Sequence, residues 1–281
     1  MAKSKEEAAQ VAPVEGLATQ PSASLPAVGP GNMDLDSMYE EDAGAGLTGT
    51  GAGDFATPFL AILQKGSPQV SRANAKFIKG AEQGMIFNTI TGELFPGDEG
   101  ILLIPCGYSK VLVEWNSRDS GGGFVATHKE NDEIVRTATR NERNQLVTTA
   151  GTIIVDTAYH FGLHIKNTGF PEYAVVSMYS TQLKKSRQWN TVMRAIMKKA
   201  PSGRIFNPPT YSHMYRLKTV GEAKDNYDWY GWSILSEGAV TDVEIYKMAR
   251  EFSKLVEAGA VRVSAPPRDA DEAADPESVP F

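Results

Sequence analysis

A basic segment in the middle of the chain holds the residues best suited to bind a charged ligand. No acidic residue lies between Tyr173 and Gly221, although the whole chain has 34. Nine cationic side chains fall in this segment: Lys184, Lys185, Arg187, Arg194, Lys198, Lys199, Arg204, Arg216 and Lys218. Such a group of cations attracts a chain of phosphates and releases its counterions. The segment therefore predicts a surface that binds a phosphate backbone.

Aromatic side chains are interleaved with these cations. Tyr211 and Tyr215 lie inside the segment, and Trp229 follows it. Trp115 and Arg118 lie beside the glycines 121–123, where a mobile loop could approach a ligand. An aromatic ring stacked on a base contributes roughly 1–3 kcal/mol, whatever the base. Because a duplex hides its base faces, the combination predicts single-stranded DNA as the partner, bound without sequence preference.

Other interpretations of the same residues remain open. A basic helix face is often only a solvated surface, and Trp189 lies on the apolar side of its expected helix. Strand alternation places Tyr211 and Tyr215 on the face opposite Arg216 and Lys218. The aromatic cluster at 227–232 divides in the same way, so one of its two pairs is expected in the core. The segment thus indicates a region that binds a ligand, but it does not show which of its residues form the site.

Catalytic and metal-binding patterns are not found in the sequence. His160 and His164 lie four apart on an expected strand, which separates them by roughly 13 Å, too far to share an ion. The glycines at 121–123 lack the Gly-Lys-Ser/Thr ending of a phosphate-binding loop. We therefore expect no enzyme activity, no metal and no cofactor.

Charge divides the chain into three regions. Residues 1–54 carry a net charge of −7, residues 55–262 carry +5, and residues 263–281 carry −4, within a total of −6. The first region is rich in Ala, Pro, Gly and Ser, so we expect a disordered acidic N-terminal arm. The middle region is long enough for one domain with its own core. The third region is expected to be a disordered acidic tail.

Alternating hydrophobicity predicts a mainly β middle region. Strands are expected within 84–96, 101–105, 111–115, 153–166, 173–180, 211–220 and 227–235. The strand at 153–166 alternates most clearly, which indicates one buried and one solvated face. Helices are expected at 180–200 and 241–258, and a short one at 55–63. We expect an OB-fold-like small barrel with one internal and one C-terminal helix, because such a barrel offers a concave face to a nucleic-acid strand.

The C-terminal tail carries a family resemblance. Its acids Asp269, Asp271, Glu272, Asp275 and Glu277 precede a terminal Pro280-Phe281. This tail resembles that of the single-stranded-DNA-binding proteins of bacteria and phages. The resemblance implies a role in DNA replication, recombination or repair, with the tail recruiting partner enzymes and competing with DNA for the basic groove. The long N-terminal arm is closer to phage replication proteins than to the shorter bacterial ones.

The remaining expectations concern location and assembly. The single cysteine, Cys106, excludes an intrachain disulfide, and no stretch has the length of a membrane span. We expect a cytoplasmic protein, in the host cytoplasm if a phage encodes it, with self-association left open. The alternative function is a structural or assembly protein of a virion. That alternative explains the β-rich body and the arms, but not the acid-free segment or the terminal phenylalanine.

Overall fold

The computed structural model describes residues 35–51, 54–117, 123–224, 227–261 and 263. The chain divides into two units, residues 1–49 and 50–281. The first unit contributes helix α1 (Leu35–Glu41), which has no buried residue. This helix lies inside the arm that the sequence analysis expects to be disordered. Residues 1–34 and the tail beyond residue 263 lie outside the described residues.

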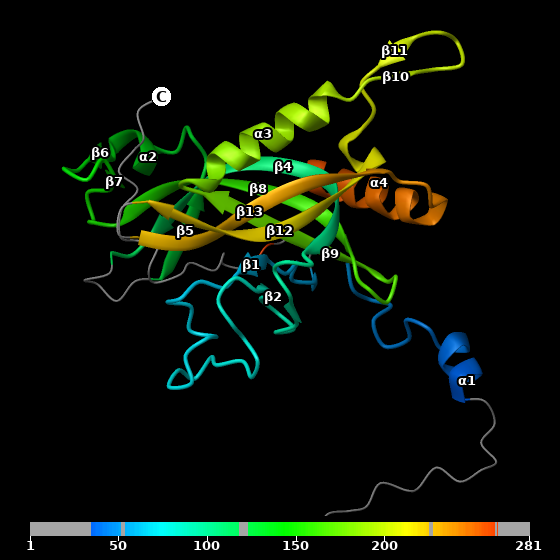
Figure 1. Cartoon of the computed structure of the whole chain (residues 1–281), viewed down its shortest axis with the longest axis horizontal. Helices are drawn as coiled ribbons and strands as arrows, with labels where there is room; N and C mark the ends of the chain where they lie inside the picture. The colour runs from blue at the N-terminus through cyan, green and yellow to red at the C-terminus, as the bar shows by residue number, and fades with distance from the viewer. Residues whose placement is uncertain (1–34, 52–53, 118–122, 225–226, 262, 264–281) are drawn as a thin grey trace, which may run out of the picture. The chain divides into compact units, whose positions relative to one another are not determined.

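The second unit is mainly β, as predicted, and centres on a curled antiparallel sheet (Figure 1). Its strand order is β13-β12-β4-β8-β7-β6, while β5 pairs with β4 and β9 pairs with β8. The strands are β4 (Ile101–Trp115), β5 (Phe124–His128), β6 (Thr139–Arg140), β7 (Leu146–Val147), β8 (Ile153–Ile165), β9 (Pro171–Tyr179), β12 (His213–Lys224) and β13 (Tyr227–Ala239). The long β4 and β8 pair along most of their length, with a bulge at Cys106.

Two smaller sheets and a few helices complete this unit. Strands β1 (Leu60–Ile62), β2 (Ile86–Asn88) and β3 (Leu94–Phe95) form one sheet, and β10 (Lys198–Lys199) and β11 (Ile205–Phe206) form a hairpin. The helices are α2 (Glu133–Thr137), α3 (Gln182–Ala195), the 3-10 helix η3 (Thr210–Ser212) and α4 (Val243–Glu257). Helix α4 confirms the predicted C-terminal helix, and Asp242 caps it by accepting from the N–H groups of Glu244 and Ile245.

Two helix predictions were wrong in their extent or type. The short helix expected at 55–63 is instead strand β1, which pairs with β2. The helix expected at 180–200 ends at Ala195, because Ile196 takes an extended conformation. Asn207 donates its side-chain N–H to the carbonyl of Ile196 at 2.7 Å, which satisfies a carbonyl that a longer helix would have used. The chain is therefore free to turn into the β10–β11 hairpin.

The central strand β8 is buried on both faces, contrary to the predicted solvated face. Ala158 belongs to a core cluster with Trp189 and Met193 of α3. Its neighbours Tyr159 and Phe161 belong to a second cluster with Ala249 and Phe252 of α4. Since successive strand residues point to opposite faces, α3 covers one face of the sheet and α4 the other. His160 and His164, expected on the solvated face, are both buried.

Strand β13 forms one end of the main sheet, and two glutamines occupy part of its outer edge. Gln64 accepts from the Tyr230 N–H and donates to the Tyr230 carbonyl, both at 2.8 Å, as a neighbouring strand would. Gln182 accepts from the Trp232 N–H at 2.9 Å. These side chains satisfy backbone groups that an edge strand otherwise leaves unpaired. They also join β13 to the β1 region and to α3.

Candidate nucleic-acid interface

Helix α3 presents the predicted cations on its outer face. Its buried residues are Gln182, Ser186, Trp189 and Met193, a spacing that puts them on one side of the helix. Lys184, Arg187 and Arg194 fall on the opposite side and are exposed. We call these three residues the basic helix face. The apolar side of α3 thus anchors it on the sheet and leaves the cations in solvent.

The β10–β11 hairpin continues this positive surface beyond the end of α3 (Figure 1). Lys198, Lys199 and Arg204, which we call the basic hairpin, are exposed there. The Arg204 guanidinium carbon lies 5.9 Å from the centre of the Phe206 ring. The hairpin also exposes Ile205, 65 % of which is accessible to solvent. Cations, which suit phosphates, therefore lie beside apolar surface, which suits bases.

Most of these cations have no acidic partner in the described part of the chain. Lys185 pairs with Glu222 at 3.2 Å, and Arg216 pairs with Glu237 at 2.6 Å. No ion pair to another described residue is seen for the basic helix face, the basic hairpin or Lys218. Within the described residues, therefore, no ion pair neutralises the charge of these cations.

A pocket of about 790 Å³ lies between α3 and strand β13, and we call it the α3 pocket. Three predicted cations, Lys184, Lys185 and Arg187, line it together with Tyr215 of β12. The other lining residues are Gln188, Trp189, Thr191, Val192, Ser233, Ile234 and Ser236. The structure therefore brings together three cations and an aromatic residue that the sequence analysis assigned to nucleic-acid binding.

The other predicted aromatic residues do not offer free ring faces at this pocket. Trp115 is buried in the core, where its ring contacts Phe124 edge-on at 6.0 Å. Tyr211 lies on η3 and packs on Tyr246, and the Trp229 Nε1 donates to Glu222 at 2.9 Å. Arg118 lies outside the described residues. Tyr215 is itself only 1 % exposed, so it can contribute to the pocket only as part of its floor.

The contribution of β13 to the pocket was not predicted from the sequence. Ser233, Ile234 and Ser236 line the pocket because β12 and β13 form a long hairpin beside α3. Val192 of α3 is 50 % exposed and also lines the pocket. Small hydroxyl side chains on a strand carry no distinctive sequence signal. The contacts across the pocket are long-range and could not be read from local patterns.

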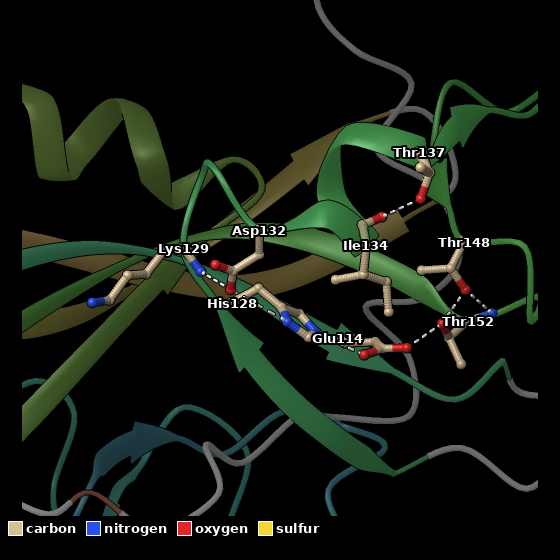
Figure 2. Close-up of polar contacts among 8 residues, drawn as sticks. All are labelled: Glu114, His128, Lys129, Asp132, Ile134, Thr137, Thr148 and Thr152. Carbon is tan, nitrogen blue, oxygen red and sulfur yellow. Dashed lines mark hydrogen bonds and ion pairs between the residues drawn. The ribbon is translucent and has the colours of Figure 1, made fainter.

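A second polar cluster lies near the β4–β5 hairpin (Figure 2). The buried Glu114 contacts His128 Nε2 at 2.7 Å through Oε2, and Thr152 donates to its Oε1. His128 Nδ1 lies 3.7 Å from a carboxylate oxygen of Asp132. Burial raises the pKa of Glu114, but the hydrogen bonds from Thr152 and His128 and the charge of His128 outweigh it and hold the pKa below its usual value. Both carboxylate oxygens of Glu114 are thus occupied, so the cluster fastens β4 to β5 and to Thr152.

Two potential nucleophiles are poorly placed for catalysis. Burial raises the pKa of Cys106 to about 12, which keeps its thiol protonated. Ser186 Oγ lies 2.8 Å from His160 Nε2, yet burial lowers the pKa of His160 to about 3, and both residues are almost fully buried. A base with so low a pKa removes a serine proton poorly near neutral pH. No group of described residues has the composition and spacing of a metal site.

Comparison with known proteins gives a family assignment. Residues 30–262 match the family described as Pam3 phage gp34-like protein, which is most of the chain. The chain belongs to the Pam3 phage gp34-like family. The match to this family begins before α1 and ends where the acidic tail was expected to begin, so it includes α3, the basic hairpin and the α3 pocket. No curated protein and no solved structure matches the chain. In the described part of this Pam3 gp34-like chain, no helix has the length and apolar character needed to span a membrane.

Proposed function

We propose that the chain binds single-stranded DNA without sequence preference during phage DNA replication or recombination. The observation that carries the proposal is the positive charge of the basic helix face and the basic hairpin, which lie in one acid-free segment and form no ion pair with another described residue. A single strand would run along α3 toward the hairpin, with its phosphates on these cations. The curled sheet would hold α3 in place, so that α3 presents its cations to the strand. In an OB-like domain the sheet itself holds the ligand. The family assignment supports a phage origin.

The first test is a titration of the full chain with fluorescently labelled oligo-dT, read by anisotropy. We expect the affinity to fall steeply as salt rises, and a duplex of equal length to bind more weakly. The triple variant Lys184→Ala, Arg187→Ala, Arg194→Ala should lose affinity about tenfold or more at low salt. It should also reduce the slope of log K against log salt by about 2, because single strands lose about 0.7 per phosphate contact.

The matched control removes the same charge from the other face of the sheet. Lys247, Arg250 and Lys254 are exposed on α4, and Lys247 and Lys254 pair with acids of the same helix. Their replacement by alanine should leave oligo-dT binding nearly unchanged. An equal loss in both triple variants would show that binding depends only on total charge. Absence of oligo-dT binding by the wild-type chain at low salt would reject the proposal and favour a virion component.

The second part of the proposal concerns the acidic tail, which we propose recruits replication or recombination enzymes. We expect deletion of residues 266–281 to raise oligo-dT affinity several-fold at low salt, since five carboxylates no longer compete with the phosphates. Deletion of Pro280 and Phe281 alone keeps these carboxylates, so it should leave DNA affinity unchanged while abolishing retention of host replication proteins on the immobilised chain. Unchanged retention by both variants would remove the tail from the proposed function.

A further inference from the structure

We propose that the α3 pocket binds one nucleotide of the strand, with its base on the pocket floor and its phosphate at the cationic rim. The inference rests on the proposed function for its choice of ligand, and it adds a specific site to a surface defined so far only by charge. The α3 pocket measures about 790 Å³, within the usual range for pockets that enclose small ligands. A pocket of this volume is therefore large enough to hold one nucleotide.

The floor of the α3 pocket is apolar and aromatic. Trp189 and Tyr215 are 2 % and 1 % exposed, and their ring centres lie 5.5 Å apart at an angle of 70°. Val192 and Ile234 add aliphatic surface to the lining. The flat faces of a base are apolar and polarisable, so they suit such a surface better than water. Inorganic phosphate alone would leave this floor uncovered.

Each of the two floor residues also has a buried polar group that no described residue binds. The Nε1 of Trp189 and the hydroxyl of Tyr215 are buried and have no hydrogen-bond partner in the described part of the chain. A buried polar group without a partner costs roughly 1–3 kcal/mol, and folded proteins keep few of them. Both groups are shielded from solvent, so a ligand reaches them only when neighbouring lining side chains move aside. Because the indole N–H can only donate, that ligand must bring an acceptor. The carbonyl oxygens of a pyrimidine ring are such acceptors.

The rim of the α3 pocket provides for a negative charge beside that ring. Lys184 and Arg187 line the pocket without an ion pair to any described residue, and Lys185 shares its charge with Glu222. The outer edge of β13 adds backbone donors. The N–H groups of Tyr230 and Trp232 point outward and donate to glutamine side chains. Because backbone N–H groups along a strand alternate between its two edges, the N–H groups of Ile234 and Ser236 lie on the same outer edge. An apolar floor with orphan donors and a cationic rim is complementary to a nucleotide.

The test is a titration of the ¹⁵N-labelled full chain, observed through its four tryptophan indole N–H signals. Thymidine monophosphate is the probe, with thymidine and inorganic phosphate as separate arms, and Trp189→Phe assigns the signal. We expect thymidine monophosphate to shift the Trp189 indole signal downfield and saturably, thymidine to act at higher concentration, and phosphate to leave the signal in place. Tyr215→Phe, which removes one donor, should weaken the binding about fivefold to tenfold, whereas Tyr211→Phe should not.

The outcomes separate this inference from the proposed function. If the Trp189 signal ignores thymidine monophosphate while oligo-dT still binds, the pocket inference is wrong and the DNA-binding proposal stands. If the signal responds but oligo-dT does not bind, the nucleotide pocket stands and the DNA-coating function fails. A shift caused equally by inorganic phosphate would reduce the pocket to an anion site and overturn the inference. Should Trp189→Phe not fold, the signal can be assigned in the wild-type chain through its proximity to the Tyr215 ring.

Discussion

Replacing Gly97 with alanine is expected to destabilise the β-rich unit by about 3 kcal/mol, at the upper end of the usual cost of overpacking. A Cβ atom at this position would lie inside the van der Waals radii of the Gly84 carbonyl oxygen and of Thr219 Oγ1. Those two atoms are themselves hydrogen bonded, and the Thr219 N–H donates to the Gly97 carbonyl at 2.9 Å. The turn after β3 must therefore move away from β12 to admit one methyl group.

Gly221→Ala is the matched control for this substitution. Gly221 lies on the same strand as Thr219, and its added Cβ would meet no atom within 4 Å. Alanine there should change the free energy of unfolding by less than about 0.5 kcal/mol, since surface changes are usually that small. Urea unfolding followed by far-ultraviolet circular dichroism measures both. Equal midpoints for Gly97→Ala and the wild-type chain would show that the turn does not pack on β12 as described.

The sequence predicted the elements whose signals are local. Strands β8 and β9 and helix α4 were found because alternation and capping are visible within a few residues. The end of α3 was misjudged because Ala195 and Lys198 both suit a helix, whereas the contact of the Asn207 side chain with the Ile196 carbonyl has no local sequence signal. Strand β1 was missed for a similar reason: its partner β2 begins at Ile86, far along the chain.

The candidate site, like the fold, could be predicted only where its sequence signals are local. The cations of α3 were found because their charge and the absence of acids are properties of one segment. Tyr215 was expected to stack on bases at the surface, yet α3 covers it, and its burial depends on Trp189. The glutamines that occupy the β13 edge have no local signature, since Gln64 meets Tyr230 across 166 positions of sequence. The placement of the helices thus decides which strand surfaces are covered, and local sequence patterns do not specify that placement.

The stability of the chain is expected to fall by about 2 kcal/mol between pH 7.5 and pH 5.0 through His160 alone. Burial without a compensating charge lowers the pKa of His160 from 6.5 to about 3. At pH 5.0 the unfolded chain therefore binds a proton that the folded chain does not, and folding stability is lost as pH falls through 6.5 toward 3. This loss corresponds to about 1.36 kcal/mol for each pH unit between the unfolded pKa and the pH of the measurement.

Urea unfolding of the wild-type chain and of His160→Gln at both pH values isolates this contribution. Glutamine does not titrate, and it can still hydrogen bond to Ser186, so the variant should lose about 2 kcal/mol less than the wild-type chain on acidification. His213→Gln is the control at a partly exposed position: burial and the charge of Lys198 lower the pKa of His213, and its effect should be smaller because solvent still reaches the ring. The same pH dependence in His160→Gln and in the wild-type chain would mean that His160 is not held neutral beneath α3.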